Sequence, residues 1–274
     1  VDQIHVVVLD MDDTLLRSDG TLSARTEESL QRWRDQGGEV VIATGRPPRA
    51  VAGSLPASLH DAPFICYNGA DARLGDRVLH ADLIPTADVQ SVLVAAERVS
   101  AEYSVGLEVD DRLYLNRPPD RFKNFVLVED LLEAANKPAA KILFVPVSKT
   151  VDVQQDTLLL KTVVADLPIS IRPMHSTRYR LLQLMSHTAD KVEALQVVLE
   201  GMGYGLENAM AFGDDVNDVG MVERSGIGVA VANAVPEVLA VADRVTHSND
   251  DDGVAMVIEE LLAVRARRAA PAGE

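Results

Sequence analysis

The chain has 274 residues, 47% of them hydrophobic and 25% charged, so it is long enough for a large core and for two domains. Its net charge of −16 argues against a general binder of nucleic acids or of anionic membranes, although a local cationic site can still hold a small phosphorylated partner. No apolar stretch has membrane-spanning length and residues 1–4 lack the basic character of a signal peptide, so we expect a cytoplasmic protein.

Strand and helix signals alternate over the first third of the chain. Three short apolar runs predict buried strands, at residues 4–9, 39–43 and 64–67. Ser23 is a candidate N-cap for a helix over 24–36, and Gly37 and Gly38 would end that helix. This order predicts a parallel sheet with right-handed crossovers.

The middle of the chain has a different pattern, in which strands follow one another in pairs. Helices are expected over 88–100 and 151–164. The expected strands are 104–109, 112–116, 141–147, 169–174 and 179–185. Turns at 110–111 and 175–177 would join two of these pairs into hairpins. Hairpins mixed with helices predict an α+β unit with an antiparallel sheet, at roughly 82–187.

The alternating pattern returns in the last third of the chain. Strands are expected at 209–213 and 227–232, and helices at 190–200, 216–224, 236–242 and 254–264. The final segment, 265–274, is rich in Ala and Arg and is expected to be flexible. We therefore expect an α/β core formed by 1–81 and 188–274, which the α+β unit interrupts.

Acidic residues follow two of the expected core strands. Asp10 and Asp12 come directly after the first strand, and Asp214 follows the strand at 209–213. Ligands of open α/β sheets bind at the carboxyl ends of the strands, so we expect these carboxylates to meet there. Their mutual repulsion calls for a cation, and oxygen ligands favour Mg²⁺. In the first motif, one carboxylate can act as a nucleophile and the other as a general acid.

Other polar residues stand at similar places, but each has a simpler explanation. Thr44, Gly45 and Arg46 end the second strand and can hold a phosphate oxygen, although such a sequence often only turns the chain. Lys191 opens a helix and can neutralise a phosphate, although an exposed surface lysine is the more common case. Cys66, the single cysteine, is expected to be a buried thiol rather than a nucleophile, because no histidine partner is visible.

Taken together, the motifs resemble a known pattern. The chain is similar to the haloacid dehalogenase superfamily of phosphohydrolases in four motifs and in their order: Asp10-x-Asp12-x-Thr14, Thr44-Gly45-Arg46, Lys191, and Gly213-Asp214-x-x-Asn217-Asp218. Three further stretches resemble the Cof-type branch, subfamily IIB: residues 65–70, 226–234 and 246–255. The resemblance covers roughly 4–262. It implies a Rossmann-like three-layer core with a parallel sheet, into which an α+β cap of type C2B is inserted.

The resemblance also implies a role for each motif residue. Asp10 would attack phosphorus and form an aspartyl phosphate, and Asp12 would protonate the leaving alcohol and then activate water. Mg²⁺ would be held by Asp10, the Asp12 carbonyl and Asp214. The phosphoryl oxygens would be bound by Thr44, Gly45 and Asn217 and neutralised by Lys191. Supporting roles would fall to Arg46, Asn68 and Asp218.

These roles predict Mg²⁺-dependent hydrolysis of a small phosphorylated metabolite, a sugar phosphate or a similar phosphate monoester. The alternatives are a phosphosugar mutase of the same superfamily, a signalling receiver module, and a non-catalytic protein that binds a phosphorylated ligand. Receiver modules are shorter and have no inserted cap. The intact set of catalytic residues argues against a non-catalytic protein. Asp13 and Val192 stand where the family often has Gly, without loss of a functional group. The residues leave open which ester is the substrate and whether the protein is a monomer or a homodimer.

Overall fold

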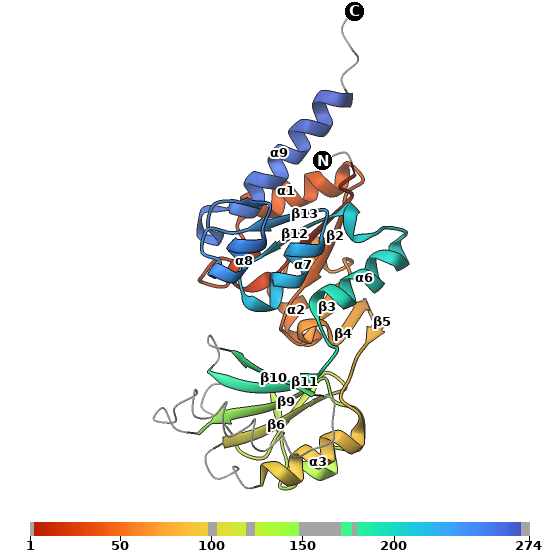
Figure 1. Ribbon diagram of the computed structural model, residues 1–274, viewed down its shortest axis with the longest axis vertical. Coiled ribbons are helices and arrows are strands. Elements are labelled where there is room, and N and C mark those ends of the chain that lie inside the picture. The colour runs from red at the N-terminus through yellow and green to blue at the C-terminus, as the bar shows by residue number, and fades with distance from the viewer. Residues whose placement is uncertain (1–2, 98–102, 119–123, 148–170, 177–179, 270–274) are drawn as a thin grey trace, which may run out of the picture. The chain divides into compact units, whose positions relative to one another are not determined.

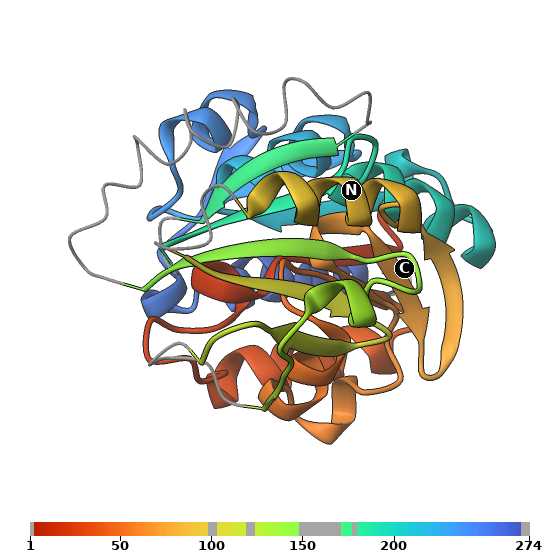
Figure 2. The ribbon, with the colours of Figure 1, turned by 90° about the horizontal axis from the view of Figure 1, so that it is seen from below.

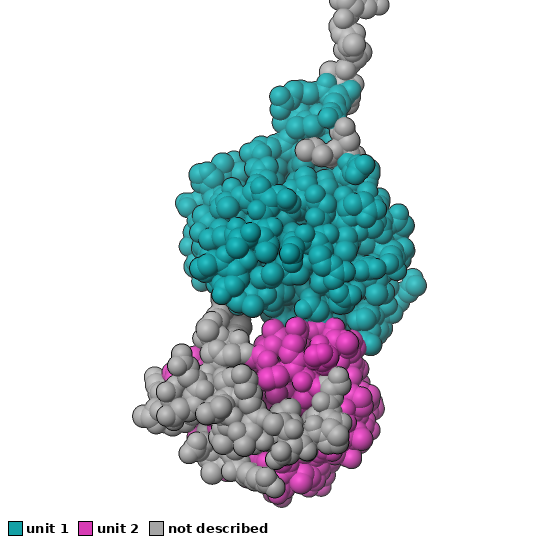
Figure 3. Space-filling model, viewed as in Figure 1, with its two compact units in different colours: residues 1–81, 190–274 teal, residues 82–189 magenta. Residues whose placement is uncertain are grey.

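The computed structural model describes residues 3–97, 103–118, 124–147, 171–176 and 180–269 (Figure 1). The chain divides into two compact units (Figure 3): the first contains Val1–Ala81 and Asp190–Glu274, and the second contains Asp82–Ala189. The insertion expected at 82–187 falls within the second unit.

An eight-stranded sheet forms the centre of the first unit (Figure 1). Its strands follow the order β14-β13-β12-β1-β2-β3-β4-β5. They are β1 (Val6–Leu9), β2 (Glu39–Ala43), β3 (Phe64–Cys66), β4 (Asp71–Leu74), β5 (Arg77–Ala81), β12 (Ala209–Gly213), β13 (Ile227–Ala230) and β14 (Arg244–Val245). The strands from β14 to β3 are parallel, whereas β4 and β5 are antiparallel to their neighbours. Every residue of β1 and β12 is buried, as expected for strands that are covered on both faces.

Helices cover both faces of this sheet (Figure 1). They are α1 (Ala24–Asp35), α2 (Pro48–Val51), α6 (Lys191–Met202), α7 (Val219–Arg224), α8 (Pro236–Val241) and α9 (Gly253–Ala269). Apolar residues of α6, α7 and α8 pack in one core with side chains of β1, β2, β12 and β13. On the opposite face, α1 and α9 contact each other, and Leu30 and Trp33 of α1 are buried. This three-layer arrangement confirms the predicted Rossmann-like core.

Local capping signals place the starts of two helices. Ser23 caps α1, as predicted, because its Oγ accepts a hydrogen bond from the N–H of Thr26 at 3.0 Å. Asp190 caps α6, because its Oδ1 accepts a hydrogen bond from the N–H of Val192 at 3.1 Å. Lys191 is therefore the first residue of α6.

A six-stranded sheet forms the second unit, in the order β10-β11-β9-β6-β7-β8. Its strands are β6 (Tyr103–Val109), β7 (Arg112–Leu115), β8 (Phe125–Leu127), β9 (Lys141–Pro146), β10 (Ile171–Ser176) and β11 (Leu181–Ser186). All neighbours are antiparallel except β7 and β8. The helices α3 (Thr86–Ala96) and α4 (Leu131–Ala134) pack in one core with residues of β6, β9 and β11, and α3 lies along one face of the sheet (Figure 2). This is the α+β architecture that the hairpin pattern predicted.

Several expected elements differ from those of the structure. Sequence analysis missed six short elements: α2, α4, β4, β5, β8 and β14. The turn expected at 175–177 is wrong in part, because β10 continues through Ser176 and pairs with β11 up to that residue. The helix expected over 216–224 begins as a 3₁₀ turn at Val216–Asp218. The helix expected over 151–164 lies outside the described residues.

The C-terminal helix is longer than predicted. α9 continues to Ala269, whereas the predicted helix ended at 264 and the segment 265–274 was expected to be flexible. Arg265 accounts for the difference, because its guanidinium donates to the carbonyls of Ile4 (3.0 Å) and Gln36 (3.3 Å) and lies 3.9 Å from the centre of the Trp33 ring. Residues 270–274 lie outside the described part. Neither α9 nor any other described helix is both long and apolar enough to cross a membrane.

Candidate active site

The two acidic motifs follow β1 and β12, which are neighbours in the sheet. The register pairs Leu9 with Phe212, and the N–H of Asp10 donates to the carbonyl of Phe212 at 3.1 Å. Carboxylate oxygens of Asp10, Asp214 and Asp218 lie within 4.8 Å of one another. The parallel pairing of β1 with β12 thus brings together two motifs that are about 200 residues apart in the sequence.

Lys191 lies between two of these carboxylates. Its side chain is fully buried, and its Nζ donates to Oδ1 of Asp10 at 2.5 Å and to Oδ1 of Asp218 at 2.6 Å. Burial disfavours the charged ammonium, but the two carboxylates outweigh this effect and raise the pKa of Lys191 above its usual range. The lysine is therefore a fixed positive charge beside Asp10, and it is not the exposed surface residue that was the simpler explanation.

Both carboxylate oxygens of Asp218 already accept hydrogen bonds from other groups of the protein. Oδ1 accepts from Lys191, and Oδ2 accepts the backbone N–H groups of Asp214 (3.0 Å) and Asp215 (3.2 Å). This arrangement requires glycine at position 213, because a Cβ on Gly213 would lie 2.4 Å from the Cβ of Asp218. Asp218 therefore orients the lysine and the loop after β12, and its oxygens are less suited to bind a metal directly.

Burial and mutual repulsion disfavour ionisation of the other two carboxylates. The pKa of Asp10 is raised well above its usual range, first by burial and then by the charge of Asp218, although Lys191 opposes the shift. The pKa of Asp214 is raised to about 7 for the same two reasons, and the hydrogen bond from the Thr14 hydroxyl opposes the shift. An additional positive charge near these groups would favour their ionised forms.

The chemistry of the cluster fits a hard divalent cation. Asp10 and Asp214 offer carboxylate oxygens, which are the ligands that such cations prefer. The Thr14 hydroxyl donates to Oδ1 of Asp214 at 2.8 Å and so orients that carboxylate. In the described part of the chain, Oδ1 of Asn217 is buried and has no hydrogen-bond partner, so it requires a donor such as a water molecule on the cation.

The carboxylate of Asp12 does not belong to this cluster. The chain turns tightly over Met11–Leu15, with Asp13 at a φ of +60°, and the Asp12 side chain meets Arg46. Nε of Arg46 donates to Oδ2 of Asp12 at 2.8 Å, and Nη2 donates to Oδ1 at 2.6 Å. Sequence analysis gave Arg46 a supporting role, and the structure identifies Asp12 as one partner of its guanidinium.

Three of the four residues expected to bind phosphate lie around one buried asparagine, Asn68. The N–H of Asn68 donates to the carbonyl of Thr44 at 3.0 Å. Gly45 is so close that a Cβ at this position would lie 2.9 Å from Oδ1 of Asn68. Nδ2 of Asn217 donates to the same Oδ1 at 2.9 Å. Asn68 therefore links the loop that follows β2 with the loop that follows β12.

Two asparagines that sequence analysis did not single out hold the turn after β1. Nδ2 of Asn233 donates to the carbonyl of Asp13 at 2.7 Å, and its Oδ1 accepts from the N–H of Asn249 at 3.0 Å. Nδ2 of Asn249 donates to the carbonyl of Leu16 at 3.0 Å. Both asparagines lie in the two C-terminal stretches that resemble the Cof-type branch, and that resemblance was the available signal.

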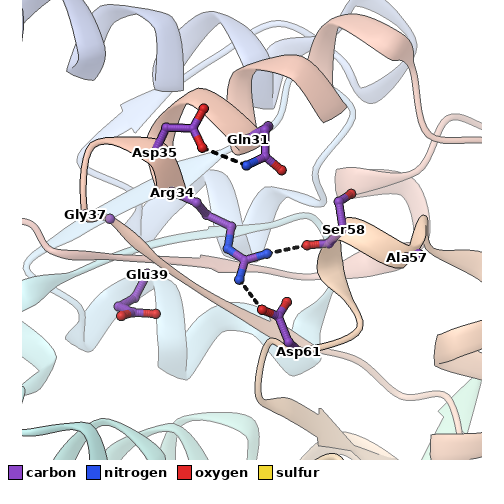
Figure 4. Close-up of a pocket in the computed structure, with 9 residues that line it drawn as sticks. Gln31, Arg34, Asp35, Gly37, Glu39, Ala57, Ser58 and Asp61 are labelled. Atoms are coloured by element: carbon purple, nitrogen blue, oxygen red, sulfur yellow. Dashed lines mark hydrogen bonds and ion pairs between the residues drawn. The ribbon is translucent and has the colours of Figure 1, made fainter.

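An open pocket lies away from this cluster (Figure 4). It is lined by α1 and by the turn at Ser58, near the start of β2 rather than its carboxyl end. Arg34 donates there to the carbonyl of Ser58 and to the carboxylate of Asp61. The acidic side chains around it, including Asp35 and Glu39, are exposed, and we assign no function to this pocket.

Comparisons with known proteins identify the family of this chain. A family model described as haloacid dehalogenase-like hydrolase matches residues 7–258. The chain is 29% identical over 273 residues to a 5-amino-6-(5-phospho-D-ribitylamino)uracil phosphatase of Bacillus subtilis, covering 95% of this chain and 98% of that protein. It is 30% identical to the pyridoxal phosphate phosphatase of Escherichia coli, covering 93% of this chain and 97% of that protein.

Solved structures show the same fold. A haloacid dehalogenase-like hydrolase from Bacteroides thetaiotaomicron has a TM-score of 0.82 at 27% identity, over 94% of this chain and 99% of that one. A sugar phosphatase of subclass IIB shares the fold at a TM-score of 0.78 and 23% identity, over 93% of this chain and 98% of that one. The chain therefore belongs to the haloacid dehalogenase-like hydrolases, as its motifs predicted, and both of the relatives compared above are named as phosphatases.

Proposed function

We propose that this protein is a Mg²⁺-dependent phosphatase that hydrolyses a small phosphorylated metabolite through an aspartyl phosphate on Asp10. The observation that carries the proposal is the buried ammonium of Lys191, which contacts the Asp10 carboxylate in a cluster with Asp214. Phosphoryl transfer depends mainly on alignment and charge neutralisation, and this cluster can supply both. The names of the two relatives, which specify small phosphorylated metabolites, support the same class of substrate.

The proposed reaction has two steps. In the first, an oxygen of Asp10 attacks phosphorus, the bond to the leaving oxygen breaks, and Asp12 donates a proton so that the product leaves as an alcohol. In the second, water attacks the phosphorus of the aspartyl phosphate, Asp12 accepts a proton from that water, and inorganic phosphate leaves with the Asp10 carboxylate restored. Mg²⁺, held by Asp10, Asp214 and the Asp12 carbonyl, would neutralise charge on the transferred group.

The remaining motif residues would bind the phosphoryl group. Thr44 and Gly45 follow β2 and Asn217 follows β12, and these two strands lie on either side of β1 in the sheet. Side chains and amides at these strand ends can therefore approach a group on Asp10 from both sides. Lys191 would neutralise the charge of the phosphoryl oxygens.

The ion pair between Arg46 and Asp12 is compatible with both tasks of Asp12. A guanidinium stabilises an ionised carboxylate, which is the form that accepts a proton from water in the second step. Donation in the first step requires the protonated form, which binds Arg46 less strongly. The pair is only partly buried, with 18% and 20% of the two side chains exposed, so it can weaken and re-form during turnover.

We also propose that the first unit is the catalytic core, because it carries the residues proposed for phosphoryl chemistry, and that the second unit is the inserted cap. A cytoplasmic location and a monomeric or homodimeric state stay predictions from the sequence.

An assay for released inorganic phosphate tests the proposed function. The protein is incubated with p-nitrophenyl phosphate and with a panel of sugar and cofactor phosphates, in Mg²⁺ or in EDTA. We expect release in Mg²⁺ without any added bisphosphate, which would distinguish a phosphatase from a phosphosugar mutase, and no release in EDTA. Asp10→Asn should abolish release while the protein stays folded by circular dichroism. Asp215→Asn, in the loop after β12, is the control and should stay active; turnover by Asp10→Asn would overturn the proposal.

A further inference from the structure

Three consecutive residues in the first unit adopt the left-handed backbone conformation. They are Tyr67, Asn68 and Gly69, with φ values of +51°, +53° and +101°. The first two are not glycine and are buried, with 2% and 3% of their surfaces exposed. Such conformations cost free energy and persist where the surrounding structure holds them, often at functional sites. Glycine and asparagine adopt this conformation readily, so it is the backbone of the buried Tyr67 that the surrounding contacts must hold.

Contacts with two other parts of the site hold this turn. The N–H groups of Tyr67 and Asn68 donate to the carbonyls of Arg46 and Thr44, both at 3.0 Å. Gly69 lies against the start of α6, since a Cβ at this position would be 2.1 Å from the carbonyl oxygen of Asp190. The turn is thus in contact with the loop after β2 and with the residue that precedes the buried lysine.

The Asn68 side chain extends these contacts to the loop after β12. Its Oδ1 accepts a hydrogen bond from Nδ2 of Asn217 at 2.9 Å. A carboxamide presents an acceptor on one side and a donor on the other, and a rotation about χ2 exchanges them. Oδ1 of Asn68 is an acceptor that faces the amino group of Asn217, so it fixes which of the two χ2 orientations the Asn217 carboxamide adopts. One amino proton of Asn217 is then committed to Asn68, while its second proton and its buried Oδ1 keep fixed directions.

We propose that Asn68 is a positioning residue for phosphoryl transfer, which acts by fixing the carboxamide of Asn217. The inference rests on the proposed function, in which the free amino proton of Asn217 donates to a phosphoryl oxygen. Asn68 itself does not touch the substrate. Its left-handed backbone is the conformation that directs its Oδ1 to Asn217 while its N–H remains bonded to Thr44.

A double-mutant cycle tests this inference. Asn68→Gly removes the acceptor, while glycine accepts the φ of +53° without strain. Asn68→Gly and Asn217→Ala should each lower kcat/KM for p-nitrophenyl phosphate about tenfold and weaken inhibition by orthophosphate, in line with the loss of a hydrogen bond to a charged group. In the double variant, Asn68→Gly should cause no further loss, because the side chain that it positions is already absent.

Two further variants separate positioning from a general loss of structure. Asn68→Asp keeps an acceptor and tolerates the left-handed backbone, so Asn217→Ala should have its full effect in that background. Asn208→Ala, a change of an asparagine before β12 that bonds to Gly205 and Gln3, is the control and should leave the kinetics unchanged. Losses that multiply in the double variant, or a fully active Asn68→Gly, would overturn the inference.

The same cycle remains informative if the proposed function fails. A wild-type protein without phosphatase activity would refute that function. Binding of orthophosphate in the presence of Mg²⁺, measured by calorimetry on the same variants, would then show whether Asn68 and Asn217 act as one unit. Equal binding by the wild type and both single variants would overturn the positioning role on its own.

Discussion

The buried ion pairs of Lys191 predict a large loss of stability for the Lys191→Met variant. The ammonium lies 2.5 Å from Oδ1 of Asp10 and 2.6 Å from Oδ1 of Asp218, and its side chain is fully buried. Methionine has a similar length but leaves two buried carboxylates without their cation. Removing one partner of a buried pair typically costs about 3–5 kcal/mol. We expect a loss of this order at pH 8 in metal-free buffer, together with loss of phosphatase activity.

The loss of stability in the Lys191→Met variant should become smaller as the pH falls. Without the ammonium, the folded variant favours the protonated form of Asp10 more strongly than the folded wild type does. The variant therefore binds more protons in its folded state, and its stability relative to the wild type declines as the pH rises. The difference between the two proteins should be smallest near pH 5 and largest near pH 8, because the pKa of Asp10 is already raised in the wild type.

Urea unfolding followed by tryptophan fluorescence measures this loss. The single tryptophan, Trp33, is buried in the first unit, so its emission reports on the unit that contains Lys191. Arg224→Met is the matched control. It removes a partly exposed cation on α7 that pairs with Glu193, and Glu193 lies on α6, the helix that carries Lys191. The control should move the urea midpoint little, as is usual for surface pairs. If Lys191→Met unfolds at the wild-type urea concentration at pH 8, the buried pairs do not have the strength argued here.

Three other predictions follow from the contacts of the site. The affinity for Mg²⁺ should fall at least tenfold per pH unit below pH 7, because protons compete with Mg²⁺ for Asp214, whose pKa is raised to about 7, and also for Asp10, whose pKa is raised. In EDTA, the raised pKa of Asp214 should lower the melting temperature as the pH rises from about 4 to 7, and added Mg²⁺ should reverse this loss. If calorimetry finds an affinity for Mg²⁺ that is independent of pH, protons and Mg²⁺ do not compete for these carboxylates. Arg46→Ala should lower kcat about 10–100-fold with little change in KM, because Asp12 loses its anchor and general acid–base catalysis weakens; unchanged kcat would show that the pair is not needed for proton transfer. Asn249→Ala should lower the unfolding free energy by about 1–3 kcal/mol, because a buried hydrogen bond to the turn after β1 is lost; an unchanged urea midpoint would argue against that role.

Local patterns predicted most of the parallel core. The apolar runs at 39–43 and 209–213 coincide with β2 and β12, because strands that are covered on both faces are apolar throughout. Ser23 predicted the start of α1, because an N-cap acts on its own neighbours. β4 was missed because it contains two charged residues, Asp71 and Arg73, and a short charged segment resembles a loop. In the folded protein these two residues form an ion pair with each other.

The order of the strand-end motifs also predicted that Asp10 and Asp214 would lie together, because parallel strands end at the same edge of a sheet. Tertiary structure alone decided which side chains pair there. Asp10 and Lys191 are 181 positions apart, and Asp12 and Arg46 are 34 positions apart. A capping residue or a buried strand is specified by its neighbours in the chain. A hydrogen bond between distant side chains depends on the packing of the whole sheet and its helices, and it exists only in the folded protein.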